Sequence, residues 1–518
     1  MAGYTSLGKK TSLDGTGLGG GGNANAFGPF GTALVSESRP TSQGAFIYSI
    51  NTTQWITSSI GAGSQVIATE GLMSCSSGTS VSGSAGVRLL RSLKYRPGQG
   101  SICRLTSIFD TGKTDTLQLA GMGNEESGYY FAMSGSSFGI LHRERSTREI
   151  RQFTITAPPA GAATLVVTLG GDQKSISING GGSANQTSYQ ISQIDYSQVG
   201  SGWVAESIDG IVYFISKLPG PHAGTFSITN VGVSIATATT LQAGVLPTQT
   251  FVSQSSWNID TMDGNGQSRF TLDPLKGNVY GIGYQYLGFG NSFFSIENPE
   301  TGLLTACHMI KRAGNYSVTN IRNPHMTARW EAINSGSAAT SVTVKGASAA
   351  VFTEGLIVRN IGPAFATAVD RIGAAVDIDT NLVPVLTLRA NRIFQGQCNY
   401  GELDLFNISI GGDTGSNSST TLLKIFIYKN AVLGGPVNFQ HIDSARSTAA
   451  VDTAATSISS NDRTQLVKSF IIGANQSITL KIEDENFFVA GGETITIAAQ
   501  TNKLTTDASF SVSWFEDQ

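Results

Sequence analysis

Histidine is the side chain with the widest chemical use, as a metal ligand and as a general acid or base, and this sequence contains five. A zinc site within one segment needs ligands a few residues apart, as in H-E-x-x-H, which is missing here. Only folding could bring two of them together. We therefore expect no metal or cofactor, and a structural or surface role for each: His142, His222, His308, His325 and His441.

Two acidic pairs, Glu125 with Glu126 and Asp260 with Asp263, are the candidates for carboxylate chemistry. Glycoside hydrolysis requires two carboxyl groups at a defined separation in space, which the sequence does not show. Clustered oxygens between Asp260 and Gly266 could hold Ca²⁺, but the alternating spacing and bidentate Glu of a calcium loop are missing. We expect a plain turn there. G-x-S-x-G occurs at Gly135–Gly139, but between two expected strands rather than at the strand-to-helix turn of a hydrolase. A non-enzymatic protein is therefore predicted, with a polysaccharide depolymerase as the enzyme class left open.

Two glycine motifs resemble phosphate-binding loops. Gly15 to Gly20 satisfies G-x-G-x-x-G, but a dinucleotide site needs a buried strand before it and a helix after it, and neither is indicated. Gly112-Lys113-Thr114 ends like a P-loop, yet Ser107 stands where that motif needs glycine. Neither is expected to bind a nucleotide.

The most charged segment runs from Leu141 to Arg151 and has four Arg and two Glu in eleven residues. A pair of solvated strands would account for it. The alternative is a subunit interface rich in Arg–carboxylate pairs, with these candidate residues: Arg143, Arg145, Arg148 and Arg151.

Aromatic rings could form a platform for sugars, since they combine an apolar face with a polar edge. The candidates, if they are exposed, are Tyr95, Trp203, Trp257 and Tyr286. A core position is the alternative for each. The four cysteines (Cys75, Cys103, Cys307 and Cys398) are far apart, without C-x-x-C, and are expected to be buried free thiols.

Composition limits the partners. Charged residues are only 13% and the net charge is −3, so binding of nucleic acid through phosphate neutralisation is not expected. No apolar run resembles a signal peptide or approaches the roughly 18 residues of a membrane span. The expectation is a soluble chain made in a cytoplasm.

The sequence pattern predicts that the elements which position these residues are β-strands. Residues 102–109 alternate after a Pro97-Gly98 turn, as in an inner strand of a sandwich. Hairpins are indicated at Ser134–Ser137, at Gly170–Asp172 and at Asp209-Gly210. Helical periodicity is nearly absent.

We predict an all-β fold of successive antiparallel β-sandwich or jelly-roll modules behind an extended Gly-rich N-terminal arm. The length of 518 residues suits several domains. The predicted boundaries are 1–45 for the arm, 46–218 and 219–355 for two β-rich modules, and 356–518 for a C-terminal β-sandwich.

A series of short motifs between residues 85 and 355 resembles large virion structural proteins of tailed phages and large double-stranded DNA viruses. They are Lys94–Gly100, Leu117–Gly123 with Gly128–Phe131, Trp257-Asn258, Leu272–Pro274 with Gly277–Tyr280, and Tyr284–Gly288. The end of the chain, Ser511–Gln518, also looks like modules appended to such proteins. The resemblance implies a fibre, spike, tail or capsid-surface protein and brings no catalytic residues.

The leading hypothesis is therefore a virion structural protein that assembles through its β modules and its arm, which contacts other virion proteins. A homotrimer is expected by analogy with fibres and spikes. The alternative is a carbohydrate-binding or host-receptor-binding adhesin of the virion, with a host surface glycan as partner.

Overall fold

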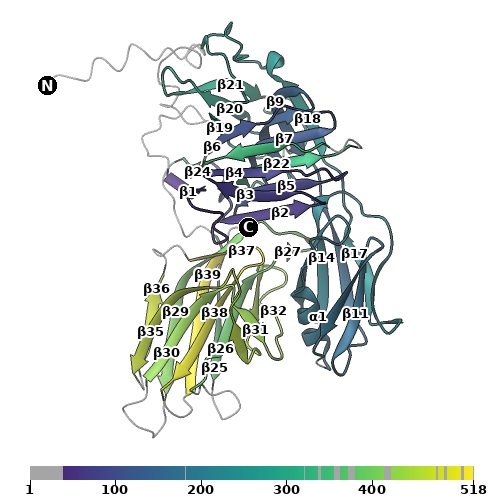
Figure 1. The fold of residues 1–518 in the computed structure, drawn as a ribbon. Coiled ribbons are helices and arrows are strands. Elements are labelled where there is room, and N and C mark those ends of the chain that lie inside the picture. The colour runs from purple at the N-terminus through teal and green to yellow at the C-terminus, as the bar shows by residue number, and fades with distance from the viewer. Residues whose placement is uncertain are drawn as a thin grey trace, which may run out of the picture. The chain divides into compact units, whose positions relative to one another are not determined.

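The computed structural model describes residues 39–180, 182–319, 321–336, 340–354, 362–371, 378, 380–413, 422–473, 476–482, 487–502 and 507–516. Nearly every element in these ranges is a strand (Figure 1). The exceptions are the helix α1 (Ala184–Ser192) and the 3₁₀ turn η1 (Gln254–Ser256). All strand pairings within the sheets are antiparallel, so the predicted all-β class is confirmed. No helix among the described residues has the length and apolarity to cross a membrane.

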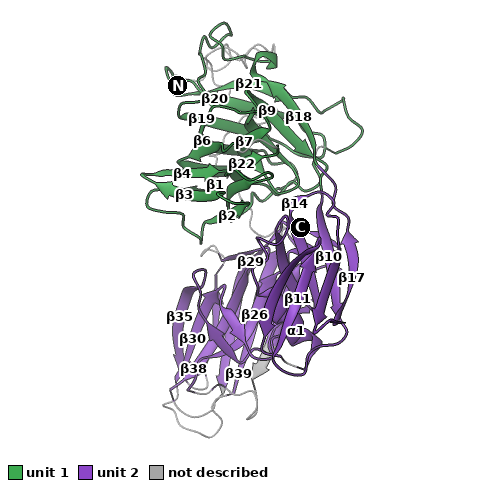
Figure 2. Cartoon of the chain, turned by 45° about the vertical axis from the view of Figure 1, so that its right-hand side comes forward, with its two compact units in different colours: residues 1–146, 247–358 green, residues 147–246, 359–518 purple. Residues whose placement is uncertain are grey.

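The chain folds into two compact units (Figure 2). Unit 1 contains residues 1–146 and 247–358, and unit 2 contains residues 147–246 and 359–518. The predicted boundary at 218/219 is wrong, because the strands on either side of it belong to one inserted segment, 147–246. The predicted arm also ends too late, because its last residues, Arg39–Ala45, are a strand of unit 1; residues 1–38 lie outside the described ranges.

Unit 1 is a sandwich of two large sheets. The nine-stranded sheet contains β21 (Leu304–Ile310), β20 (Ser292–Glu297), β19 (Asn278–Tyr284), β6 (Ser101–Phe109), β24 (Ser348–Thr353), β1 (Arg39–Ala45), β23 (Thr343–Gly346), β4 (Leu72–Ser76) and β3 (Gln65–Thr69). β6 pairs with β19 on one side and with β24 and then β23 on the other. The predicted inner strand is therefore confirmed, and its residues alternate between buried and more accessible positions.

The facing seven-stranded sheet has the order β18 (Thr248–Ser253), β9 (Ser137–Glu144), β8 (Gly128–Ser134), β7 (Thr116–Gly123), β22 (Thr327–Asn334), β5 (Ser84–Leu89) and β2 (Trp55–Ile60). The predicted hairpin at Ser134–Ser137 joins β8 to β9, and Gly135 has the positive φ that this turn needs. One apolar core lies between the two sheets and contains residues of both, such as Leu105 from β6 and Phe131 from β8.

The inserted segment of unit 2 is a smaller sandwich with its own core. One sheet has the order β13 (Trp203–Ile208), β14 (Ile211–Pro219), β10 (Arg148–Ile155) and β17 (Ala236–Gln242), and the other has β12 (Asp172–Ile178), β11 (Ala163–Leu169), β15 (Phe226–Asn230) and β16 (Val233–Ser234). The predicted hairpins at Gly170–Asp172 and Asp209-Gly210 are confirmed. The helix α1 was not foreseen. Its sequence is polar, and its clearest signal is Ser183, whose side chain accepts a hydrogen bond from Gln186 N as an N-cap.

The rest of unit 2 is the C-terminal sandwich. Its five-stranded sheet contains β25 (Ala364–Arg371), β39 (Asp507–Glu516), β29 (Glu402–Asp413), β36 (Ser477–Lys481) and β37 (Phe488–Ala490). Its six-stranded sheet contains β32 (Gln440–His441), β33 (Ala449–Asp452), β26 (Val383–Ala390), β38 (Thr494–Thr501), β30 (Leu422–Lys429) and β35 (Gln465–Gly473). Two small ribbons are β27 (Ile393–Phe394) with β28 (Gln397–Cys398), and β31 (Val432–Gly434) with β34 (Ser457–Ser459).

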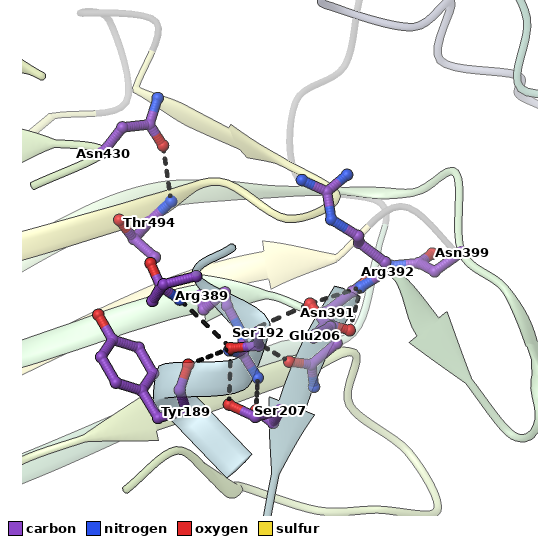
Figure 3. Close-up of polar contacts among 11 residues, drawn as sticks. Tyr189, Ser192, Glu206, Ser207, Arg389, Asn391, Arg392, Asn399, Asn430 and Thr494 are labelled. Atoms are coloured by element: carbon purple, nitrogen blue, oxygen red, sulfur yellow. Dashed lines mark hydrogen bonds and ion pairs between the residues drawn. The ribbon is translucent and has the colours of Figure 1, made fainter. Parts of the chain in front are cut away.

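A buried polar contact joins the inserted segment to the C-terminal sandwich (Figure 3). Arg389 of β26 donates to Ser207 O at 2.8 Å and lies 3.6 Å from a carboxylate oxygen of Glu206 on β13. Glu206 also accepts from Arg392 N at 2.9 Å. An apolar cluster beside it contains Tyr189 of α1 and Phe439. The two parts of unit 2 are thus held by paired charges as well as apolar packing.

Candidate functional site

An open groove of ≈910 Å³ lies in unit 1, on the outer face of the nine-stranded sheet. Its wall is the loop that follows β1, and its floor comes from β1, β6, β19 and β24. The lining residues are Gln43, Gly44, Ala45, Ile47, Tyr48, Ser49, Ile50, Asn51, Thr52, Gln54, Arg104, Leu105, Thr106, Val279, Ser348, Ala349 and Ala350.

Three buried rings anchor the wall of the groove. Phe46 is stacked on Trp55 with ring centroids 4.3 Å apart, and Trp330 lies 5.9 Å from both. The indoles fit because two neighbours are glycines: a Cβ on Gly44 would lie 2.6 Å from Trp55, and one on Gly346 would lie 2.5 Å from Trp330. Stacked aromatic rings contribute both buried area and defined geometry, so the loop has a fixed base.

Beyond this base the loop presents apolar side chains to solvent. Ile47 is 69% exposed and Tyr48 is 94% exposed. The loop then turns at Asn51, whose Oδ1 accepts from Thr53 N at 3.0 Å and whose carbonyl accepts from Trp55 N at 2.9 Å. An exposed tyrosine on a well-anchored loop offers a ring face to a ligand at low cost in conformational entropy.

The polar groups of the groove are mostly amides and hydroxyls. The side chains of Gln43, Ser49 and Gln54 form no hydrogen bond with any residue that the structure describes, so their donors and acceptors are available. Arg104 stands on the floor, exposed, with its guanidinium carbon 5.5 Å from the centre of the Phe352 ring. The described residues of the lining include no Asp, Glu, His or Cys.

The four predicted platform rings have different positions. Trp203 and Trp257 are 1% and 5% exposed and belong to the cores of the inserted segment and of unit 1, so neither offers a ring face. Tyr95 and Tyr286 are half-buried and form an edge-to-face pair with centroids 5.2 Å apart. The Tyr95 hydroxyl accepts from Leu287 N, and the Tyr286 hydroxyl donates to Ile321 O. The structure thus brings two of the four together, away from the groove lining.

The predicted interface arginines are divided between the units. Arg143 contacts Glu331 at 3.2 Å, and Arg151 pairs with Glu149 and lies 4.0 Å from the Phe226 ring. Arg148 lies 5.7 Å from the Tyr400 ring, while Arg145 is exposed with a left-handed φ of 59°. Two of these charges are therefore neutralised within their own unit, and a role between subunits stays a prediction.

The described ranges contain no group of three or more His, Cys, Asp or Glu side chains that could hold a metal. Burial, and then the Arg312 charge, lowers the pKa of His142 to about 3. Asp260 accepts from Met262 N and Ser268 N, which confirms a turn there. All four cysteines are buried and free, as predicted, and burial raises the pKa of Cys75 and Cys103 far above its usual range.

Comparison with known proteins identifies no family. No family model and no curated protein matches the chain. Among solved structures, the carbohydrate recognition domain of Emp46p in its metal-free form matches with 11% identity, 61% of this chain, 96% of that chain and a TM-score of 0.24. The legume lectin-like domain from Entamoeba histolytica matches with 9% identity over 59% of this chain and 96% of that chain, with a TM-score of 0.21. The infectious bursal disease virus VP2 subviral particle matches with 9% identity over 82% of this chain and 74% of that chain, with a TM-score of 0.15. Structural similarities with TM-scores this low support no conclusion about the function of this chain.

The groove was not predicted from the sequence. Its one local signal is Ile47-Tyr48, an apolar pair followed by Ser49, Asn51 and other turn-forming residues. Because a large apolar side chain in a turn has few routes to the core, such a pair is a reasonable sign of an exposed contact. The floor of the groove comes from strands far away in the sequence, and no local pattern indicates it.

Proposed function

We propose that this chain is a non-enzymatic carbohydrate-binding adhesin and that the groove of unit 1 is its binding site. The observation that carries the proposal is Tyr48, 94% exposed at the edge of an open groove lined by amide and hydroxyl groups. Sugars present apolar C–H faces and polar hydroxyls together, and a tyrosine ring beside amides matches both.

The roles of the residues follow from their positions. The Tyr48 ring would pack against a C–H face of one sugar, and the amides of Gln43 and Gln54 would exchange hydrogen bonds with its hydroxyls. Because the groove is open, an oligosaccharide could enter from the side. Glycoside cleavage commonly uses two carboxyl groups. None belongs to the described lining of the groove, which supports binding without hydrolysis.

The test is a glycan array followed by titration of the best ligand. Tyr48→Ala should weaken binding about 10-fold or more, by analogy with aromatic anchors elsewhere. Tyr316→Ala is the matched control, because Tyr316 is also an exposed tyrosine of unit 1 but does not line the groove. Absence of any glycan ligand, or equal loss in both variants, would overturn the proposal.

A second candidate function, structural assembly within a virion, is favoured by one strand in unit 2. β35 is at the edge of its six-stranded sheet and exposes apolar side chains, with Ile471 60% and Leu466 49% exposed. Exposed apolar edge strands tend to pair with other chains. Together with the motifs that resemble virion proteins, this supports self-association as a fibre, spike, tail or capsid-surface component.

Native mass spectrometry tests this second candidate. A stable oligomer that Ile471→Lys dissociates would support it, and Val231→Lys is the control, since Val231 is 93% exposed in the inserted segment. A monomer at all concentrations would exclude it.

A further inference from the structure

The groove has an unusual charge balance for a surface with so many polar groups. Among the described residues that line it, Arg104 is the one that carries a charge. Within the described ranges no carboxylate lies close enough to Arg104 to form an ion pair. Among the residues that the structure describes, no negative charge therefore compensates the positive charge on the floor of the groove.

The position of Arg104 keeps this charge accessible. Arg104 lies in β6, and its cross-strand neighbours are Gly281 on β19 and Ala350 on β24. Neither neighbour has a side chain long enough to cover a guanidinium group. The contact with the Phe352 ring at 5.5 Å orients the group without neutralising it.

An exposed arginine differs from an exposed lysine in what it can bind. The guanidinium is planar and presents parallel N–H donors that match both oxygens of a carboxylate or a sulfate. Beside it, the groove supplies the ring of Tyr48 and neutral amides, which suit a sugar but would not by themselves favour an anion.

From this charge complementarity we infer that the groove selects an acidic saccharide, one that carries a carboxylate or sulfate group, with Arg104 as the residue that determines specificity. The inference rests on the proposed function and adds the chemical class of the ligand. Arg104 would bind the acidic group while Tyr48 packs against the sugar ring.

The experiment compares acidic glycans with neutral counterparts of the same backbone: sialylated, uronate-containing and sulfated oligosaccharides on one array beside their desialylated, reduced and desulfated forms. The wild-type chain should prefer the acidic member of a pair by about 10-fold or more, the scale of a hydrogen bond to a charged group. This preference should shrink on going from 50 to 500 mM salt, because salt screens exposed charges.

Arg104→Gln should remove the preference and the salt dependence while leaving binding of the neutral counterpart within about twofold, as for a change confined to one contact. Arg104→Lys keeps the charge but loses the bidentate geometry, so part of the preference should remain. Lys345→Gln is the matched control, since Lys345 is exposed on the same sheet, pairs with Ile108 of β6 and does not line the groove.

The outcomes separate the two claims. If acidic and neutral glycans bind equally, and Tyr48→Ala weakens both while Arg104→Gln weakens neither, the proposed function stands and the inference is wrong. If no glycan of either kind binds, both are wrong. A change in the thermal unfolding of Arg104→Gln, checked by circular dichroism, would identify a folding defect, and Arg104→Lys would then carry the test.

Discussion

Arg104 in unit 1 and Arg389 in unit 2 both lie within β-strands of large sheets, yet their surroundings are opposite. Arg104 is exposed and has no carboxylate partner among the described residues, whereas Arg389 is 5% exposed, lies 3.6 Å from Glu206 and 3.9 Å from the Phe439 ring. A buried charge must be paired, because desolvation is costly. An exposed charge needs no partner for stability, so an exposed arginine without a carboxylate nearby is available to bind an anionic ligand. The comparison separates an arginine used for structure from one available for binding.

The largest effect is expected at the buried arginine. Arg389→Ala leaves the Glu206 carboxylate buried without its cation and should destabilise unit 2 by about 3–5 kcal/mol. Denaturant titration followed by hydrogen exchange of unit 2 peptides measures this. If the loss is no greater than that for Arg104→Ala, the contrast between the two arginines is wrong.

Acid should distinguish the stability of unit 1 from binding in its groove. The His142 ring is stacked on Tyr129 and its Nδ1 lies 3.0 Å from Arg312, with Glu144 nearby at 3.9 Å. Its folded-state pKa of about 3 lies below the unfolded value of 6.5, so the unfolded state takes up the proton first. Unit 1 should therefore lose up to about 1.4 kcal/mol per pH unit as the pH falls from 6.5 towards 3.

Urea unfolding of unit 1 at pH 7 and pH 4.5 tests this acid sensitivity, which His142→Phe should reduce. Glycan binding should stay constant from pH 5 to 8 while unit 1 remains folded, because the described lining contains no Asp, Glu, His or Cys. A pH-dependent affinity in folded protein would show that a group outside the lining takes part.

A smaller loss of stability is expected at Gly346, where the absence of a side chain leaves room for the buried ring of Trp330. Gly346→Ala places a Cβ 2.5 Å from Trp330, and such overpacking costs about 1–3 kcal/mol. Glycan binding should weaken as well, since Trp330 supports the groove wall. Gly283→Ala in β19 of the same sheet is the control, because its Cβ would meet nothing closer than 3.9 Å. Equal Tm values for the two variants would contradict this account of the wall.

The smallest effect on stability is expected at the groove residues. Arg104→Ala and Tyr48→Ala should each change the free energy of unfolding by less than about 0.5 kcal/mol, as exposed substitutions usually do. Differential scanning calorimetry checks this. A larger loss would mean that these side chains stabilise unit 1, and their exposure would no longer indicate a binding role.

Part of the fold could be predicted because its signals are local. The strands of β6 and β39 and the hairpin at Gly170–Asp172 each follow from alternation or from glycine in a turn within a few residues. The domain boundaries could not, because residues 147–246 belong with 359–518 through contacts such as Arg389 with Glu206. The predicted platform failed at Trp203 and Trp257 because composition does not indicate which side of a strand faces a core.

By itself the sequence determined that this chain is built of antiparallel strands and lacks the usual spacings of metal and nucleotide sites, because these properties depend on neighbours along the chain. Only the tertiary structure decided which rings are buried and where a groove opens. Gly44, Trp55, Trp330 and Gly346 meet at the base of the loop that forms the groove wall, although some 300 residues separate the first from the last. Packing between such distant residues, rather than any local pattern, leaves Tyr48 and Arg104 exposed on the same surface.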